Sequence, residues 1–290
     1  AIDQLQNAPT DKPLFLAVGY IKPHLPWYVP QEYFDRFPLA EIQLPAVKEN
    51  DLDDIPPAGV KMAKPEGDHA KVLGAGEWKK AVQGYLATIS FLDDQVGRLL
   101  DALESSDRAK DMIVVWWTDH GWHLGEKEHW RKFALWEDAT RTSMAIAAPG
   151  ITQPGTTTNA PVDYMNVYPT ICQLAGIPVP EHVKGDSLVP LLNDPNAKWV
   201  QKAICTHGRG NHAAIDNNWR YIRYADGSEE LYDHTNDPNE WTNLAGEVGM
   251  SDHKTRLAAA LPAVESEVAP TLAPKAKGKN KSKAKKTKEE

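Results

Sequence analysis

The segment from Thr118 to Lys132 carries the densest group of titratable and aromatic side chains in this chain. It follows an apolar run, Met112 to Trp117, which predicts a buried strand. Asp119 and His120 leave that strand side by side, and a carboxylate beside an imidazole can hold a divalent cation at the end of a strand. Metal ligation is therefore the preferred interpretation of Asp119, against a capping or turn role.

Three histidines in this segment invite a rival interpretation as a zinc site: His120, His123 and His129. Imidazole is a common ligand of transition metals. However, the spacing His-x2-His-x5-His fits no compact zinc signature. We therefore expect His123 and His129 to bond to the backbone or to line the pocket.

A second polar group follows another apolar run. Residues 14–20 predict a strand that is covered on both faces, as in the interior of an α/β sheet. Two prolines then interrupt regular structure and hold His24 and Trp27 at the end of this strand. Ligands gather at the carboxyl ends of strands in open parallel sheets, so this segment is a second candidate for the site.

The remaining patterns indicate the elements that position these groups. Apolar residues recur at three- and four-residue steps from 77 to 105 and predict an amphipathic helix. With a strand before and after it, this helix suggests a parallel α/β unit. A third strand is expected from 144 to 148 and a short helix from 168 to 174. Asp226-Gly227 between two aromatic-rich segments predicts a hairpin.

Composition limits the class of protein. The chain has 290 residues, 41% of them apolar and 25% charged, which is typical of a globular protein with a substantial core. No apolar run approaches the roughly 20 residues of a membrane span. The net charge is −8, while the run from Lys275 to Glu290 is basic and predicts a solvated tail rather than a nucleic-acid site. Cys172 and Cys205 fit no disulfide-dense scaffold.

Several motifs, in order, resemble the sulfatases of the alkaline-phosphatase superfamily. Thr118 to Gly121, Leu124-Gly125-Glu126 and Trp130-Arg131-Lys132 are similar to the second active-site motif of that family. Val18 to Pro26, with Lys22-Pro23-His24 inside it, resembles its Lys-Pro-His motif. Later segments also match: Ala139 to Thr142, Ala148-Pro149-Gly150 and Asp237 to Leu244. The matching motifs run from about Pro13 to Leu244, and they resemble those of the iduronate 2-sulfatase branch.

The resemblance implies roles for individual residues. Asp119 and His120 correspond to ligands of a single Ca²⁺, although an imidazole is an unusual partner for this cation. Lys132 corresponds to a lysine that contacts the sulfate ester and offsets its negative charge. His24 corresponds to a histidine that contacts the sulfate and protonates the leaving alkoxide, with a structural histidine as the alternative. Further residues expected to contact the substrate are Lys22, Trp122, His123 and Trp130.

The tryptophans near these motifs have two possible roles. Trp27, Trp122 and Trp130 could form apolar walls on which a sugar ring stacks. Core packing is the alternative for each of them.

The resemblance also implies how the chain is organised. We expect an α/β fold with a mixed, largely parallel sheet flanked by helices, alkaline-phosphatase-like and incomplete at the N-terminus. Residues 1–200 correspond to the C-terminal part of a sulfatase catalytic domain and 201–262 to a small antiparallel α+β subdomain. Residues 263–290 have too few apolar side chains to fold and predict a disordered Lys-rich tail.

The nucleophile of the family has no counterpart in this chain. Sulfatases use a formylglycine made from a Cys/Ser-x-Pro/Ala-x-Arg motif, which the sequence lacks. The paired aspartates that open the family's first strand are missing as well. We therefore expect the sequence to begin partway through a longer protein, with formylglycine upstream, and we expect this chain alone to hydrolyse no sulfate ester.

The function implied is that of a sulfuric ester hydrolase acting on a sulfated sugar or polysaccharide, periplasmic or extracellular as relatives commonly are. The alternatives are a phosphodiesterase or phosphonate hydrolase of the same superfamily, and a noncatalytic carbohydrate-binding remnant. The sequence does not indicate the oligomeric state. The whole interpretation depends on Asp119, His120, Lys132 and His24 converging around one anion pocket.

Overall fold

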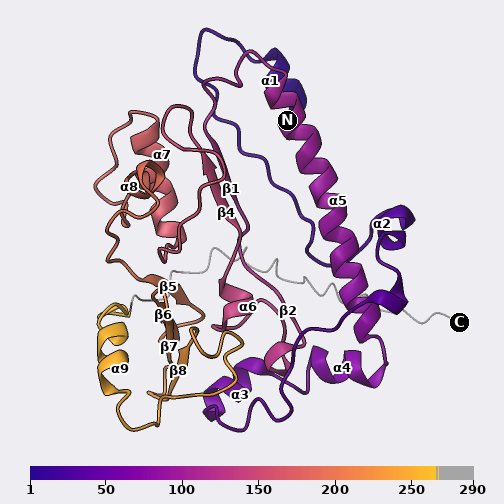
Figure 1. Cartoon of the computed structure of the whole chain (residues 1–290), viewed down its shortest axis with the longest axis vertical. Coiled ribbons are helices and arrows are strands. Elements are labelled where there is room, and N and C mark those ends of the chain that lie inside the picture. The colour runs from indigo at the N-terminus through magenta and orange to yellow at the C-terminus, as the bar shows by residue number, and fades with distance from the viewer. Residues whose placement is uncertain (266, 268–290) are drawn as a thin grey trace, which may run out of the picture.

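The described residues fold into one long helix, several short helices and three sheets (Figure 1). The computed structural model describes residues 1–265 and 267. The helices are α1 (Ile2–Asn7), α2 (Gln31–Asp35), α3 (Pro57–Ala63), α4 (Asp68–Gly74), α5 (Trp78–Glu104), α6 (Glu137–Thr140), α7 (Val167–Leu174), α8 (Val189–Asn193) and α9 (Ser251–Ala258). The strands are β1 (Val114–Trp117), β2 (His123–Leu124), β3 (Trp130–Arg131), β4 (Met144–Ala147), β5 (Ala203–Thr206), β6 (His212–Ile215), β7 (Trp219–Arg223) and β8 (Glu229–Asp233). None of the described helices is long and apolar enough to cross a bilayer.

Helix α5 runs along one side of the molecule and confirms the helix predicted from 77 to 105 (Figure 1). Gly84 lies on its buried face. A Cβ at this position would stand 3.0 Å from Cε3 of Trp27, so the absence of a side chain lets the indole pack against the helix. The indole Nε1–H in turn donates to the Pro23 carbonyl at 3.0 Å. Helix α5 therefore supports the proline-rich segment that carries His24.

The strands predicted around 112–117 and 144–148 form one ladder. β1 pairs antiparallel with β4, with Val114 opposite Ala147 and Trp117 opposite Met144. The predicted parallel unit with residues 14–20 is not formed, because those residues contain no strand and β1 pairs only with β4 among the described strands. All ladders between the described strands are antiparallel, which differs from the expected largely parallel sheet.

Residues 14–20 differ most from the sequence-based expectation. They contain no strand, and in the view of Figure 1 their indigo trace passes between α5 and β1. Phe15 is 81% exposed, and the neighbouring Ile21 is 78% exposed. The prediction of a strand covered on both faces is therefore wrong for the described chain. An apolar run indicates a preference for a buried strand, but it does not indicate which strands are available to pair with it.

The C-terminal part forms a four-stranded antiparallel meander in the order β5-β6-β7-β8. The predicted hairpin is confirmed, since β7 and β8 pair across a turn in which Gly227 has φ +87°. Helix α9 covers one face of the sheet through Leu257, which packs on Tyr221 and Leu231. The division at residue 200 stays a prediction. The predicted Lys-rich tail lies almost wholly outside the described residues.

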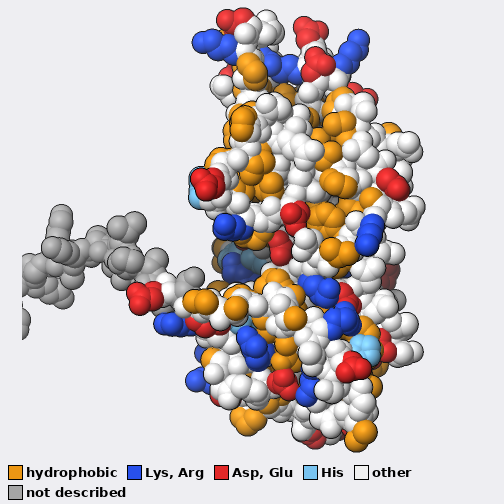
Figure 2. Space-filling model, turned by 90° about the vertical axis from the view of Figure 1, so that its left-hand side faces the viewer, with side chains coloured by type: hydrophobic (Ala, Val, Ile, Leu, Met, Phe, Trp, Pro, Cys, Tyr) orange, Lys and Arg blue, Asp and Glu red, His pale blue; other side chains and the backbone are white. Residues whose placement is uncertain are grey.

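One face of the molecule carries α7, α8 and α9, and Figure 2 views it directly. Apolar side chains gather on the upper part of this face, and charged ones are interspersed on the lower part. The exposed large apolar residues between 164 and 200 are Tyr164, Met165, Tyr168, Ile177, Val179 and Val200. The segment around α7 and α8 therefore leaves more apolar surface in solvent than the C-terminal sheet does.

A buried guanidinium joins the C-terminal sheet to the rest of the fold. The Arg220 side chain on β7 is 1% exposed and forms ion pairs with Glu240 and with Glu137 of α6. It also donates to the Leu135 carbonyl at 2.9 Å and to the Thr140 hydroxyl at 2.8 Å. Every side of this charge is paired, which is the condition under which a buried ion is tolerated.

A second buried carboxylate lies beside it. Glu230 on β8 accepts hydrogen bonds from the Tyr224 and Tyr232 hydroxyls and from Trp136 Nε1–H. Gly59 of α3 presses against this group, because a Cβ there would collide with Glu230 Oε1 and lie 3.0 Å from the Tyr224 hydroxyl. Helix α3 can therefore approach the sheet only with glycine at this position.

Substitution of Gly59 tests this close approach. We expect Gly59→Ala to destabilise the protein by about 2 kcal/mol, because the methyl group overpacks a filled polar site. Gly97→Ala in α5 is the matched control, since its Cβ meets nothing within 4 Å, and it should stabilise by roughly 0.5–1 kcal/mol. Urea unfolding of both variants measures the difference. Equal stability of the two would contradict the predicted collision.

The ion pairs of Glu240 predict a pH dependence of stability. Burial alone would raise the pKa of Glu240, but Arg220 and His234 outweigh it and lower the pKa from its ordinary 4.5 to about 2. Because the folded-state pKa is depressed, the stabilisation is present above about pH 4.5 and is lost as the pH falls toward 2.

We therefore expect Glu240→Gln to lower the free energy of unfolding by about 3 kcal/mol near neutral pH, since it leaves the buried Arg220 charge without a full partner. The gap from wild type should narrow below about pH 4.5. Thermal and urea unfolding between pH 7 and pH 2 measure it, with the exposed Glu247→Gln as control. A gap that does not depend on pH would show that Glu240 is not the titrating group.

Candidate functional site

The segment from 118 to 132 forms a compact hairpin rather than an open loop. β2 pairs with β3, and the turn between them holds Gly125 at φ +127°. A Cβ on Gly125 would lie 2.8 Å from Cε2 of Trp78, so the turn requires glycine for both conformation and space. Lys127 in the same turn is buried and paired with Asp51 at 2.9 Å. The hairpin is therefore fixed to the segment that precedes α3.

Asp119 and His120 follow β1, as the sequence predicts, and their side chains lie together. His120 Nε2 is 3.4 Å from Asp119 Oδ2, and the Asp119 side chain is 83% exposed. His120 Nδ1–H donates to the Gly121 carbonyl at 2.7 Å. This bond fixes the tautomer, because a carbonyl can only accept, and it leaves the Nε2 lone pair beside the carboxylate. A carboxylate oxygen and an imidazole nitrogen so placed fit a divalent cation.

His24 lies close to this pair although about a third of the chain separates them in sequence. The ring centroids of His24 and His120 are 6.4 Å apart, and the ring of Trp122 lies 5.6 Å from His24 and 6.0 Å from His120. His24 Nδ1–H donates to the Leu25 carbonyl at 2.7 Å. The Nε2 atom is therefore the one available for proton transfer. Three of the four residues expected to converge are thus brought together.

The two predicted lysines are placed differently. Lys132 follows β3, and its Nζ lies 5.8 Å from the ring centroid of its neighbour Phe133. Within residues 1–265, no hydrogen bond or ion pair joins Lys132 to His24, Asp119 or His120. Lys22 donates from Nζ to the Pro26 carbonyl, which closes the proline-rich loop on itself. The predicted contacts of both lysines with a sulfate ester therefore stay predictions.

The aromatic residues expected to contact a sugar are buried. Trp122 stacks on Tyr85 with centroids 6.0 Å apart and 23° between the ring planes. Trp122 and Trp130 belong to a core cluster that also packs on Trp27, and His123 has no exposed surface. Trp122 and Trp130 pack in the core, as the alternative describes. The predicted contact of these residues and of His123 with a sugar stays a prediction. Trp122 contacts both His24 and His120 and so helps to position them.

Gly121 connects the site to α6. Its N–H donates to the Ala139 carbonyl at 2.8 Å. A Cβ on Gly121 would collide with the Asp138 carbonyl oxygen and stand 2.8 Å from that of Arg141. Since Gly121 follows His120 directly, the backbone of α6 restricts where the Asp119–His120 pair can lie.

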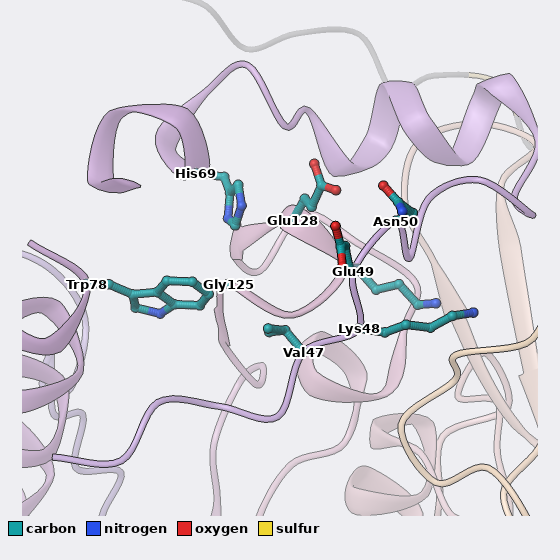
Figure 3. Close-up of a pocket in the computed structure, with 9 residues that line it drawn as sticks. Val47, Lys48, Glu49, Asn50, His69, Trp78, Gly125 and Glu128 are labelled. Carbon is teal, nitrogen blue, oxygen red and sulfur yellow. The ribbon is translucent and has the colours of Figure 1, made fainter. Parts of the chain in front are cut away.

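A cavity of about 220 Å³ opens beside the hairpin turn and is shown in Figure 3. Its lining combines the loop residues Val47, Lys48, Glu49 and Asn50 with His69, Trp78, Gly125, Lys127 and Glu128. Burial lowers the pKa of His69, and its Nδ1 accepts from Trp130 Nε1–H at 3.3 Å. Asp119, His120, His24 and Lys132 do not line this cavity, so it is separate from the candidate site.

Sequence reasoning missed one group of side chains that the fold assembles. His123, Glu126 and Asp138 offer ligand atoms that all lie within 4.8 Å of one another. The signal available in the sequence was the histidine cluster, but the partner Asp138 lies on α6, beyond the hairpin. A similar group, Glu137, His234 and Glu240, already surrounds the Arg220 guanidinium and is an ion-pair network.

Two family profiles together match residues 1–267 of this chain. The profile described as Sulfatase matches residues 1–177. This chain belongs to the sulfatase family. A second profile, described as N-sulphoglucosamine sulphohydrolase, C-terminal, matches residues 125–267 of the same sulfatase chain and so spans the C-terminal sheet. The sulfatase family generally binds a divalent metal, in keeping with the acidic and histidine groups present here.

Curated relatives agree with this membership. A sulfatase of Formosa agariphila is 43% identical over 255 residues, which are 87% of this chain and 50% of the relative. The iduronate 2-sulfatase of Mus musculus is 32% identical over 216 residues, 62% of this chain and 39% of the relative. The chain thus spans about half the length, or less, of these relatives.

Solved structures share the fold and confirm the mixed α/β class. A phosphonate monoester hydrolase from Silicibacter pomeroyi superposes with a TM-score of 0.70 at 24% identity, covering 83% of this chain and 53% of that one. A structure in complex with its substrate D-glucosamine-2-N,6-O-disulfate superposes with a TM-score of 0.59 at 26% identity, covering 65% and 41%. The first likeness concerns the fold alone.

The geometry of Asp119 predicts the effect of removing its charge. We expect Asp119→Asn to weaken Ca²⁺ binding by at least about tenfold, because a neutral amide replaces the charged oxygen ligand beside His120. Isothermal titration calorimetry measures the affinity. Asp53→Asn, in an exposed loop, is the matched control and should leave it unchanged. If both variants bind Ca²⁺ as the wild type does, Asp119 is not a ligand.

Proposed function

We propose that this chain forms part of a sulfuric ester hydrolase that acts on a sulfated carbohydrate. The observation that carries the proposal is the approach of His24 to the Asp119–His120 pair, with 6.4 Å between the two imidazole centroids, in a chain of the sulfatase family. The substrate class is supported by similar proteins, one bound to D-glucosamine-2-N,6-O-disulfate and one named a 2-O GAG sulfatase.

Asp119 and His120 would hold the cation, through a carboxylate oxygen and Nε2. When bound, Ca²⁺ would offset the negative charge of the sulfate oxygens. The exposure of Asp119 leaves room for further oxygen ligands, which Ca²⁺ requires in larger number than these two residues supply. Formylglycine, expected upstream, would supply the oxygen nucleophile.

His24 would serve as the proton donor to the leaving alkoxide. Its Nδ1–H is held by the Leu25 carbonyl, so a proton moves only at Nε2, and the ring is oriented by its edge contact with Trp122. Lys132 and Lys22 would contact the sulfate as point charges. For Lys132 this requires the side chain to leave its position over the Phe133 ring.

A phosphonate monoester hydrolase is the second candidate, favoured by the TM-score of 0.70 to a protein of that name. Sulfate monoesters and phosphonate monoesters are both monoanions, and they differ in the central atom and in the carbon group bound to phosphorus. The ester that binds more tightly therefore distinguishes the two candidates. A noncatalytic carbohydrate-binding protein is the third. We place the sulfatase in the periplasm or outside the cell by analogy with its relatives.

Ligand binding tests the proposal without requiring turnover. We expect the full chain with Ca²⁺ to bind glucosamine 6-O-sulfate at least about tenfold more tightly than glucosamine, because the anion contacts His24, Lys132 and the cation. Isothermal titration calorimetry provides the affinities. His24→Gln and Lys132→Ala should each remove most of the preference, while Lys79→Ala, exposed on α5, should retain it.

Three results would count against the proposal. Equal binding of the sulfated and unsulfated sugar would favour a general carbohydrate-binding role. Tighter binding of phenyl methylphosphonate than of phenyl sulfate would favour the phosphonate hydrolase. A preference that survives in both His24→Gln and Lys132→Ala would place the anion site elsewhere.

A further inference from the structure

The backbone of residues 12–20 forms no hydrogen bond within the part of the chain that the structure describes. The segment contains no helix or turn after residue 12, and residues 13–21 carry no charged side chain. Leu14 and Leu16 are partly buried while Phe15 between them is exposed, which is the alternation of a strand. The segment therefore offers unpaired N–H and C=O groups along both of its edges.

The segment runs in the same direction as β1 (Figure 1). At its start, the guanidinium of Arg108, which precedes β1, donates to the Ala8 and Pro9 carbonyls at 3.0 and 2.6 Å. At its end, the ring of His24 lies 6.4 Å from that of His120, which follows β1. Helix α5 connects the two, as in a parallel strand–helix–strand unit. Each end of the segment thus lies near the corresponding end of β1, yet no ladder joins them among the described strands.

Strand β1 has a free edge as well. It pairs with β4 on one side and with no described strand on the other. An isolated two-stranded ladder is marginally stable in water, and most sheets have more strands. Residues 14–20 and β1 are therefore two edges that share a direction, are tethered at both ends and do not bond to each other. One further strand between them would pair with both.

We propose that a strand from the half of a sulfatase domain that this chain does not match lies between residues 14–20 and β1 and pairs with both. The chain covers 50% of its relative from Formosa agariphila and 53% of the phosphonate monoester hydrolase that shares its fold, so each of those proteins has about as much chain again. A strand satisfies the free backbone groups on both edges, which a lipid or a purely apolar contact would leave unpaired. The occupant is therefore a polypeptide strand.

This position links the added strand to the candidate site. Parallel strands end at the same edge of a sheet, so a strand that runs with its two neighbours ends beside His24 and the Asp119–His120 pair. The groups that it delivers there depend on the proposed function, whereas its place depends on the free edges alone. The exposed side chains of Phe15 and Ile21 form an apolar face that the same half of the domain covers.

Complementation by a relative tests the proposal. The full chain is co-expressed with the half of the Formosa agariphila sulfatase that precedes its matched segment, and the relative's own matched half is the positive control. We expect a one-to-one complex by size-exclusion chromatography with light scattering. Amides of residues 14–20 should exchange with deuterium as an unstructured peptide does in the chain alone, and at least about a hundredfold more slowly in the complex.

Two variants locate the contact. Phe15→Asp places a charge on the exposed face, and Val18→Pro removes a backbone donor that a central strand needs. Each should lower the yield of complex by at least about tenfold, while Val248→Asp, at an exposed apolar side chain outside the segment, should leave it unchanged. Because the backbone of residues 12–20 forms no hydrogen bond in the described chain, each free variant should keep the melting temperature of the wild type.

Several results would overturn the proposal. One is a relative's half that binds its own matched segment and does not bind this chain. Others are unchanged exchange of residues 14–20 within a complex, and a complex that both variants form as the wild type does. A homodimer that excludes the relative's half would assign the edges to a second copy of this chain. No sulfate ester enters these measurements, so their failure is distinct from a failure of the sulfated-sugar test.

Discussion

The buried charge of Arg220 is the constraint on which the rest of this structure depends. A guanidinium without water must be paired on all sides, and its partners come from two segments: Glu240 from one, and Glu137 with the Leu135 carbonyl from the other. The C-terminal sheet therefore cannot shift against α6 without leaving a charge unpaired. Fully satisfied networks of this kind are rigid. Loss of one member leaves the remaining buried polar groups without a partner, and this destabilises the fold.

That rigidity reaches the candidate active site through a short path. α6 follows Leu135, and its backbone presses on Gly121, the residue between His120 and Trp122. Trp122 then packs between His24 and His120. Through these contacts the C-terminal sheet helps to position the Asp119–His120 pair and His24. The two family profiles, which match residues 1–177 and 125–267, overlap in the region that contains α6.

Local patterns in the sequence predict the elements well because each depends on neighbours along the chain. The period of α5 and the Asp226-Gly227 turn are examples, as is the place of Asp119 and His120 after a strand. Pairing between distant segments leaves no such trace. The sequence of residues 14–20 predicts a buried strand, but the segment is largely exposed. The contact of His123 with His129 depends on the conformation of a hairpin turn, which their spacing in the sequence does not reveal. Family motifs, rather than periodicity, connected His24 to His120.

The exposed apolar segment that ends at Ile21 has a practical consequence for work with the purified chain. An extended stretch with exposed Phe15, Val18 and Ile21 offers both apolar side chains and backbone groups to a strand of another molecule. Low charge between Pro13 and Ile21 removes the electrostatic barrier that usually prevents such pairing. Concentrated samples should therefore self-associate through this segment. Dilute, cold storage with a mild nonionic detergent should keep the molecules apart.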